Sequence, residues 1–184
     1  MRIVILASGS GSLAQAIFDA DLALEILQVI SDKPSQVLAR AELAGIPTTY
    51  LPVEGDRDTW DAQLFTLVES LNPDLVVSVG FMRILSAKFV NRFATINTHP
   101  ALLPNFPGAH AVRDAIAAGV QTTGATVHWV DEGVDTGKVI TSAHVQVLAS
   151  DDASSLHERI KIVERELIVE TLAKFIATGI DGQK

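Results

Sequence analysis

The chain has 184 residues and a formal net charge of −8, with 14 lysines and arginines against 22 aspartates and glutamates. Its length is typical of about one domain, and its acidic charge disfavours broad nucleic-acid binding, which depends on lysine and arginine. Cysteine is absent, which excludes disulfides, a thiolate nucleophile and a cysteine-based zinc site. The apolar runs are too short for a secretory signal or a spanning helix, so we expect a cytoplasmic protein without a membrane partner.

The first half of the chain alternates short apolar runs with amphipathic ones. Residues 58–71 form the clearest helix, because the apolar residues from Trp60 to Leu71 recur on one helical face. The alternation predicts an α/β fold, an open and mostly parallel twisted sheet with helices on both faces. We expect strands at 2–7, 25–31, 48–51, 75–79 and 95–98, and helices at 12–20, 35–44, 58–71 and from about residue 86.

The second half departs from this rhythm. Residues 125–130 and 139–147 read as strands on either side of the turn-rich segment 131–138, which predicts an antiparallel extension of the sheet. A last helix is expected at about 154–177. With no repeat or linker in the sequence, we expect residues 1–184 to form a single domain.

Ligands of open α/β sheets bind beyond the carboxyl ends of the strands. The loops that follow Ala7, Val79 and Thr98 are therefore expected to share one cleft.

The loop Ser8–Ser12 is rich in glycine and leads from the first strand into the first helix. Glycine lets the backbone approach a ligand, and the free N–H groups of a helix start favour an anion. These features predict a phosphate site, with Ser12 as the helix cap. The loop also matches the dinucleotide pattern G-x-G-x-x-G/A, with Asp32 as the acid that binds ribose. Another phosphate site, a dinucleotide site and a plain turn all remain open here.

Asn97 and His99 lie two residues apart at the end of a predicted strand, so their side chains share one face. An amide and an imidazolium can stabilise an oxyanion, and the imidazole can also transfer protons, which suits a carbonyl reaction. The alternative is a turn capped by Asn97 beside a buried structural histidine. Without cysteine or zinc-type histidine spacing, no metal site is expected. We interpret the remaining histidines as packing or surface residues: His110, His128, His144 and His157.

Three carboxylates, Asp131, Glu132 and Asp135, crowd the glycine-bracketed loop between the last two strands. One interpretation is a polar hairpin turn. In the other, one carboxylate pairs with His99, raises the pKa of the imidazole and relays a proton through water.

Together these motifs resemble the glycinamide ribonucleotide formyltransferase family, folate-dependent enzymes of purine synthesis. The similarity covers nearly the whole chain, and it outweighs the dinucleotide interpretation of the first loop. Its most specific parts are the run Asn97-Thr98-His99-Pro100 and the Gly124–Ile140 stretch that contains Asp135-Thr136-Gly137. Further similar stretches are Ser8–Ser12, Gly80–Leu85, Ala101–Pro104 and Phe106–Gly108.

The resemblance implies that the formyl group of 10-formyltetrahydrofolate moves directly to the amine of 5′-phosphoribosylglycinamide, with no metal. By position, it implies Asn97, His99 and Asp135 as catalytic residues. The ribonucleotide and its phosphate would be bound by Gly11, Ser12, Leu13, Lys161 and Glu164. The folate would be bound by Arg57, Met82, Arg83, Ile84, Leu85 and Asp131, with the 131–135 loop closing over the pterin.

Some of these residues have simpler interpretations. Glu164 could form an ordinary ion pair with Lys161 three residues earlier, and surface solvation is as good an account of Arg57 and Arg83 as contact with the carboxylates of the folate glutamate. The sequence also departs from the family pattern. Leu13 stands where many relatives carry Asn, and Lys138 stands where proline is common. The early end of the chain puts a last edge strand in doubt.

Three rivals remain beside this hypothesis. A formyltetrahydrofolate hydrolase usually carries an additional N-terminal domain, and a methionyl-tRNA formyltransferase usually carries a C-terminal RNA-binding domain. A dinucleotide-dependent oxidoreductase or nucleotide sensor would rest on the first loop and Asp32 alone. The expected partners are small-molecule substrates rather than nucleic acid, and a homodimer is compatible with the sequence.

Overall fold

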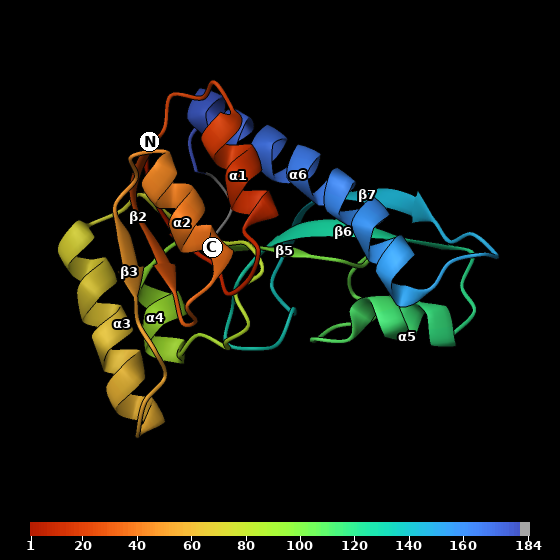
Figure 1. Cartoon of the computed structure of the whole chain (residues 1–184), viewed down its shortest axis with the longest axis horizontal. Helices are drawn as coiled ribbons and strands as arrows, with labels where there is room; N and C mark the ends of the chain where they lie inside the picture. Colours follow the sequence, from red (N-terminus) through yellow and green to blue (C-terminus); the bar gives the residue numbers. More distant parts are fainter. Residues whose placement is uncertain (181–184) are drawn as a thin grey trace. The chain divides into compact units, whose positions relative to one another are not determined.

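The computed structural model describes residues 1–180, in which seven strands and six helices follow one another along the chain (Figure 1). The strands lie in the order β3-β2-β1-β4-β5-β6-β7. The pairs β1–β2, β1–β4 and β2–β3 are parallel, whereas β6–β7 is antiparallel. The predicted α/β fold, with a mostly parallel sheet and an antiparallel extension, is confirmed. The chain divides into two compact units, residues 1–96 and residues from 97 onward.

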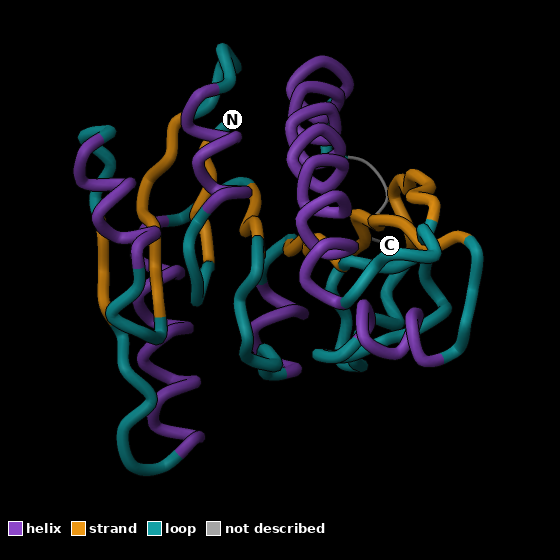
Figure 2. The backbone as a smooth tube through the Cα atoms, turned by 45° about the vertical axis from the view of Figure 1, so that its right-hand side comes forward, coloured by secondary structure: helices purple, strands orange, loops and turns teal. Residues whose placement is uncertain are grey.

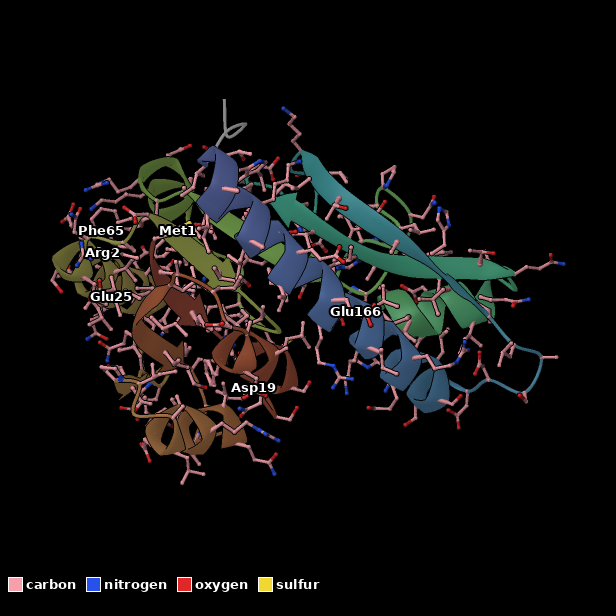
Figure 3. The ribbon with its side chains drawn as sticks, turned by 90° about the horizontal axis from the view of Figure 1, so that it is seen from above. Met1, Arg2, Asp19, Glu25, Phe65 and Glu166 are labelled. Carbon is pink, nitrogen blue, oxygen red and sulfur yellow. The ribbon has the colours of Figure 1, made fainter. Side chains whose placement is uncertain are left out.

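The first unit has helices on both faces of its parallel strands. Strand β1 is flanked by β2 and β4, and its apolar side chains are fully buried, which explains the continuous apolar run in the sequence. Figure 3 shows α1, which ends at Asp19, and α2 on one face, with α3, which carries Phe65, and α4 on the other. The elements are β1 (Arg2–Leu6), α1 (Ser12–Asp19), β2 (Glu25–Ser31), α2 (Gln36–Leu43), β3 (Thr48–Tyr50), α3 (Arg57–Leu71), β4 (Leu75–Ser78) and α4 (Ala87–Arg92).

The start of α1 differs from the prediction. Ser12 is the first residue of the helix, and the cap is Gly11, which makes no side-chain capping bond. Gly11 has a left-handed φ of 75°, and a Cβ there would lie 2.7 Å from the Cβ of Val37 in α2. Glycine is therefore required at this position by the close approach of α2.

The second unit is built on a hairpin covered by a long helix. Strand β5 (Thr95–His99) leads into this unit, which then holds α5 (Ala111–Ala117), β6 (Thr122–Trp129), β7 (Val139–Gln146) and α6 (Ala153–Thr178). Helix α6 packs against β6 and β7 (Figure 2), and Trp129 stacks on Phe175 of that helix with ring centroids 5.5 Å apart. A capping box of Asp152 and Ser155 begins α6.

The sequence pattern predicts no helix at 111–117, and it places the start of β6 three residues too late. The last edge strand that the sequence puts in doubt would fall after α6, largely outside the described residues. Across residues 1–180, no helix combines the length and the apolar character that crossing a bilayer requires.

Candidate functional site

Asp135 lies at the centre of a polar cluster within the second unit. One carboxylate oxygen, Oδ2, lies 3.3 Å from Nδ1 of His99 and accepts the Gly108 N–H at 2.8 Å. The other, Oδ1, lies 3.5 Å from Nε2 of His128, which in turn lies 3.2 Å from the amide nitrogen of Asn97. The predicted contact between His99 and a loop carboxylate is therefore confirmed. The structure also brings Asn97 into the same cluster.

Local backbone geometry positions this cluster. Strand β5 carries Asn97 and His99 two residues apart, whereas Asp135 sits in the hairpin loop with a left-handed φ of 55°. A non-glycine residue in that region is strained and is held by its surroundings. Two loop glycines make room for the turn. A Cβ on Gly133 would meet the Thr136 hydroxyl at 2.0 Å, and one on Gly137 would meet the Trp129 carbonyl at 1.8 Å.

The electrostatics of His99 differ from the prediction. Burial lowers the pKa of His99 below its usual 6.5, and the nearby His128 also lowers it. The Phe106 carbonyl and the Asp135 carboxylate act in the opposite direction without offsetting burial. Pairing with Asp135 does raise this pKa, as expected, but the net shift is downward because the desolvation of a charged imidazolium outweighs the attraction to one carboxylate.

The Asp135 carboxylate is the charged partner in the cluster. Burial alone would raise its pKa, but His128, the Gly108 N–H and His99 together bring the pKa below the usual 3.8. Asp135 is therefore ionised at neutral pH. It can orient His99 and can stabilise an imidazolium when one forms.

His128 belongs to this cluster, although its sequence context predicts a packing residue. Its side chain is buried, and its Nδ1 lies 2.8 Å from the Trp129 carbonyl, which leaves Nε2 facing Asn97 and Asp135. The only sequence signal was its position near the end of the strand that precedes the aspartate loop.

Glu164 lies buried on α6, and burial raises its pKa to about 7. The nearby Thr98 side chain and Lys161 each lower that pKa in part. Lys161 instead donates to Glu158 at 2.7 Å, one turn earlier. The alternative of an ordinary Glu164–Lys161 ion pair is therefore wrong. A buried carboxyl with a shifted pKa is a candidate for function.

The predicted phosphate-binding residues Gly11, Ser12 and Leu13 form the start of α1. No side chain caps this end of the helix. The backbone N–H groups of its first turn therefore donate to no capping side chain. The side chain of Leu13 is buried, which accounts for an apolar residue at this position. Asp32 cannot serve a ribose hydroxyl as the dinucleotide hypothesis requires. Its side chain is fully buried and already bonded to Ser8 and Arg83.

The predicted folate-binding residues of the first unit gather around the loop after β4. Met82 and Ile84 are exposed, whereas Leu85 is buried. Arg83 forms an ion pair with Asp32, and Arg57 forms one with Asp61 at 2.9 Å. This loop therefore exposes two apolar side chains, Met82 and Ile84, close together in the sequence.

Asp131, also predicted to bind folate, serves the hairpin turn in this structure. Its carboxylate accepts the Gly133 N–H at 3.0 Å and the Thr136 hydroxyl at 2.7 Å. The side chain of Lys138 is exposed, and its carbonyl accepts the Trp129 N–H at 2.9 Å. Nothing in the structure explains lysine at this position.

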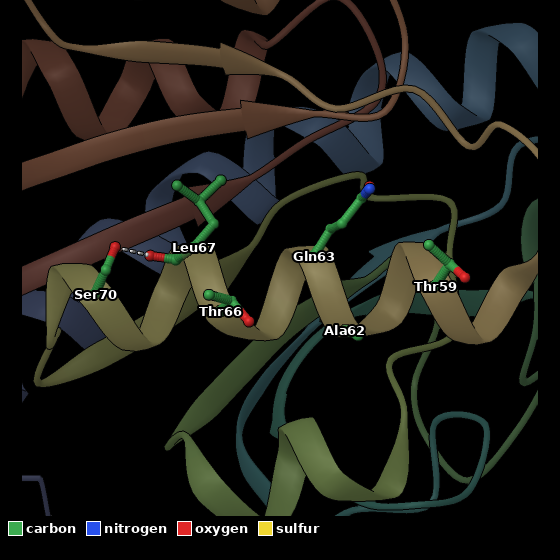
Figure 4. A pocket seen from close by; sticks show the side chains of 6 residues that line it. All are labelled: Thr59, Ala62, Gln63, Thr66, Leu67 and Ser70. Carbon is green, nitrogen blue, oxygen red and sulfur yellow. Dashed lines mark hydrogen bonds between the residues drawn. The ribbon is translucent and has the colours of Figure 1, made fainter.

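Two other features lie apart from these residues. An open hollow follows one face of α3 (Figure 4), and no predicted site residue lines it: Thr59, Ala62, Gln63, Thr66, Leu67 and Ser70. Within residues 1–180 there is no group of three or more histidine, aspartate or glutamate side chains arranged to hold a metal ion. In contrast, the Asn97–His99–Asp135 cluster offers an amide donor, a neutral imidazole and a carboxylate. These groups can stabilise an oxyanion and transfer a proton, as the transfer of an acyl group requires.

Comparisons with known proteins agree with this chemistry. The formyl transferase family model matches residues 1–172. Phosphoribosylglycinamide formyltransferase of Mycobacterium tuberculosis is 46% identical over 97% of this chain and 86% of its own length. The crystal structure of glycinamide ribonucleotide transformylase 1 from Symbiobacterium toebii has a TM-score of 0.93 at 35% identity, and covers 100% of this chain and 92% of its own. That of phosphoribosylglycinamide formyltransferase from Bacillus halodurans has a TM-score of 0.92 at 33% identity, and covers 100% and 99%. This chain belongs to the formyl transferase family.

Proposed function

We propose that this chain transfers the formyl group of 10-formyltetrahydrofolate to the amine of 5′-phosphoribosylglycinamide, a step of purine biosynthesis. The observation that carries the proposal is the cluster of Asn97, His99 and Asp135 in a chain of the formyl transferase family. The names of the similar proteins support the choice of the amine substrate.

The reaction starts when the amine nitrogen attacks the formyl carbon. The Asn97 amide donates a hydrogen bond to the formyl oxygen as negative charge develops there. His99, which burial keeps neutral, accepts the proton that the amine loses. The Asp135 carboxylate stabilises the imidazolium so formed, and that imidazolium is a second donor to the oxyanion.

The carbon bond to N10 of the folate then breaks, and the proton moves from His99, through water, to N10. The products are the formylated ribonucleotide and tetrahydrofolate, and no covalent enzyme intermediate is needed. In the free protein, Nε2 of His99 lies 2.8 Å from the Phe106 carbonyl. The substrate therefore has to take the place of that carbonyl if Nε2 is to face the reacting atoms.

The substrates are assigned to residues by position in the family. The phosphate is bound by the N–H groups of Gly11, Ser12 and Leu13, and the ribonucleotide also by Glu164 and Lys161. The folate is bound by the 82–85 segment, Arg57 and Asp131. We further propose that residues 1–184 act as one formyltransferase domain in the cytoplasm, with small molecules rather than nucleic acid or membrane as partners. A homodimer stays a prediction.

The test is an absorbance assay of a 10-formyl folate analogue, with and without 5′-phosphoribosylglycinamide. Deformylation that requires the amine, with recovery of the formylated ribonucleotide, is expected. Deformylation at the same rate without the amine would identify a hydrolase instead. No reaction under either condition would reject formyl transfer altogether.

Variants then test the catalytic assignments. His99→Ala and Asp135→Asn are each expected to lower kcat by roughly 10²–10³-fold, the range found when one transition-state donor is removed. His157→Ala is the control, because that half-buried histidine on α6 also has a pKa lowered by burial. Near-normal turnover in either cluster variant would remove that residue from the mechanism.

A further inference from the structure

Asp32 is a fully buried carboxylate outside the catalytic cluster. It follows the end of β2, and none of its side-chain surface is exposed. The Ser8 hydroxyl donates to Oδ1 at 2.5 Å, and Nε of Arg83 donates to Oδ2 at 2.6 Å. A buried charge is retained only when it is well paired, and here both oxygens are used. Asp32 therefore does not bind ribose as the dinucleotide hypothesis required. The burial of this carboxylate needs another explanation.

Ser8 links Asp32 to the loop after β4. Because its hydroxyl hydrogen is directed to Asp32, its lone pairs are free to accept the Met82 N–H, which lies 2.9 Å away. The Ser8 N–H in turn donates to the Gly80 carbonyl at 3.1 Å. Asp32 thus holds the loop twice, through the side chain of Arg83 and through the backbone of Met82.

A further contact holds the same loop from α3. Arg57, the first residue of that helix, donates from Nη2 to the Ile84 carbonyl. Its Nε pairs with Asp61 at 2.9 Å, and its guanidinium lies 5.0 Å from the ring centroid of Trp60. Residues 80–85 contain no helix or strand, yet the side chains of Ser8 and Arg57 bond their backbone, and Asp32 bonds the side chain of Arg83.

This fixed loop presents apolar side chains to solvent. Met82 is 55% exposed and Ile84 is 61% exposed, while the flanking Phe81 and Leu85 are buried. Exposed neighbouring apolar side chains on an ordered backbone suit a flat aromatic ligand, and the thioether of methionine favours aromatic contact.

We propose that Asp32 is a positioning residue for the folate co-substrate: it fixes the 80–85 loop in its binding conformation before the ligand arrives. This inference rests on the proposed function. Holding the loop in advance removes part of the ordering entropy that binding would otherwise cost. Asp32 touches neither substrate in this proposal, so its loss weakens folate binding and spares the chemical step.

The experiment compares Asp32→Asn with wild type in the formyl-transfer assay. The KM for the 10-formyl folate analogue is expected to rise roughly tenfold. The corresponding loss of binding free energy is about what ordering one or two side chains costs. The kcat and the KM for 5′-phosphoribosylglycinamide are expected to stay within about twofold of wild type, on the uniform-binding argument. In the free protein, hydrogen exchange of the Met82 amide is expected to accelerate by about the same tenfold factor.

Asp151→Asn is the matched control. The side chain of Asp151 is 4% exposed and pairs with Arg159, which is 33% exposed, close to the 0% and 34% of Asp32 and Arg83. This control should leave the folate KM unchanged. If Asp32→Asn fails to fold, Ser8→Ala, which removes the link to the Met82 N–H and keeps the Asp32–Arg83 ion pair, carries the same expectation for the folate KM.

An unchanged folate KM, or an equal loss in all kinetic constants, would overturn the inference. So would the same KM rise in Asp151→Asn. The wild type decides separately whether the proposed function holds. Amine-dependent transfer by the wild type with a normal folate KM in Asp32→Asn and Ser8→Ala would reject only the role of Asp32.

Discussion

At the scale of single residues, burial outweighs pairing in setting the pKa of two side chains of the second unit. His99 and Glu164 both lie in the second unit, and burial shifts each toward its neutral form. For His99 the neutral form is the one that can accept a proton. For Glu164 the neutral form has a consequence for stability that can be measured.

Glu164→Gln is expected to stabilise the protein at pH 8 but not at pH 4.5. The pKa of Glu164 is about 7 in the folded protein, above the usual 4.5. Between these values the folded protein holds a proton that the unfolded chain has released, so the free energy of unfolding falls as the pH rises through this window. Linkage puts the whole loss at about 3 kcal/mol. Glutamine does not titrate, so the variant escapes it.

Urea unfolding at pH 4.5 and pH 8 measures this difference. Glu158→Gln is the control, because Lys161 lowers the pKa of that exposed carboxylate. It should show no gain at pH 8. An equal effect of Glu164→Gln at both pH values would mean that Glu164 titrates normally, against the burial described above.

At the scale of elements, the helices with local end signals are predicted well from sequence. Helix α3 begins one residue before its predicted start, and Asp56 caps it by accepting the Thr59 N–H. Helix α6 differs from its predicted bounds by one residue at each end. These caps are short-range features, so they can be recognised before any packing is known.

The features missed from sequence depend on long-range packing. Helix α5 has seven residues and no side-chain cap, and it packs against α6. Such a short helix gains its stability from tertiary contacts. His128 joins the cluster because the hairpin loop folds Asp135 back onto β6. The net lowering of the His99 pKa was missed for the same reason, since a local motif does not show how deeply a side chain is buried.

Gly11 tests the packing of two elements, α1 and α2. Gly11→Ala is expected to destabilise the protein by about 3 kcal/mol, because it adds a strained left-handed φ to a clash with Val37. Gly45→Ala is the matched control. Its φ is 71°, but nothing lies within 4 Å of a Cβ there, so strain alone should cost about 1 kcal/mol. Equal losses in urea unfolding would contradict the close approach of the two helices.

At the scale of the whole molecule, each unit contains its own part of the proposed machinery. The first unit carries the phosphate loop and the 80–85 loop, whose contacts confirm that the loops after Ala7 and Val79 lie together. The second carries the catalytic cluster and Glu164. That the loop after Thr98 joins the same cleft stays a prediction. The proposed reaction needs both sets of residues, so ligand binding should stabilise the complete chain.

A folate analogue without the formyl group is therefore expected to raise the Tm of this protein. At 100 times its Kd, it should add about 2.7 kcal/mol, which for a chain of this size corresponds to roughly 5–10 °C. NAD at the same concentration should leave the Tm unchanged, because the acid that would bind its ribose is the buried Asp32. Differential scanning calorimetry of the same sample with each ligand makes the comparison. A Tm raised by NAD and not by the folate analogue would require Asp32 to leave Ser8 and Arg83, and would overturn both the folate proposal and the role assigned to that carboxylate.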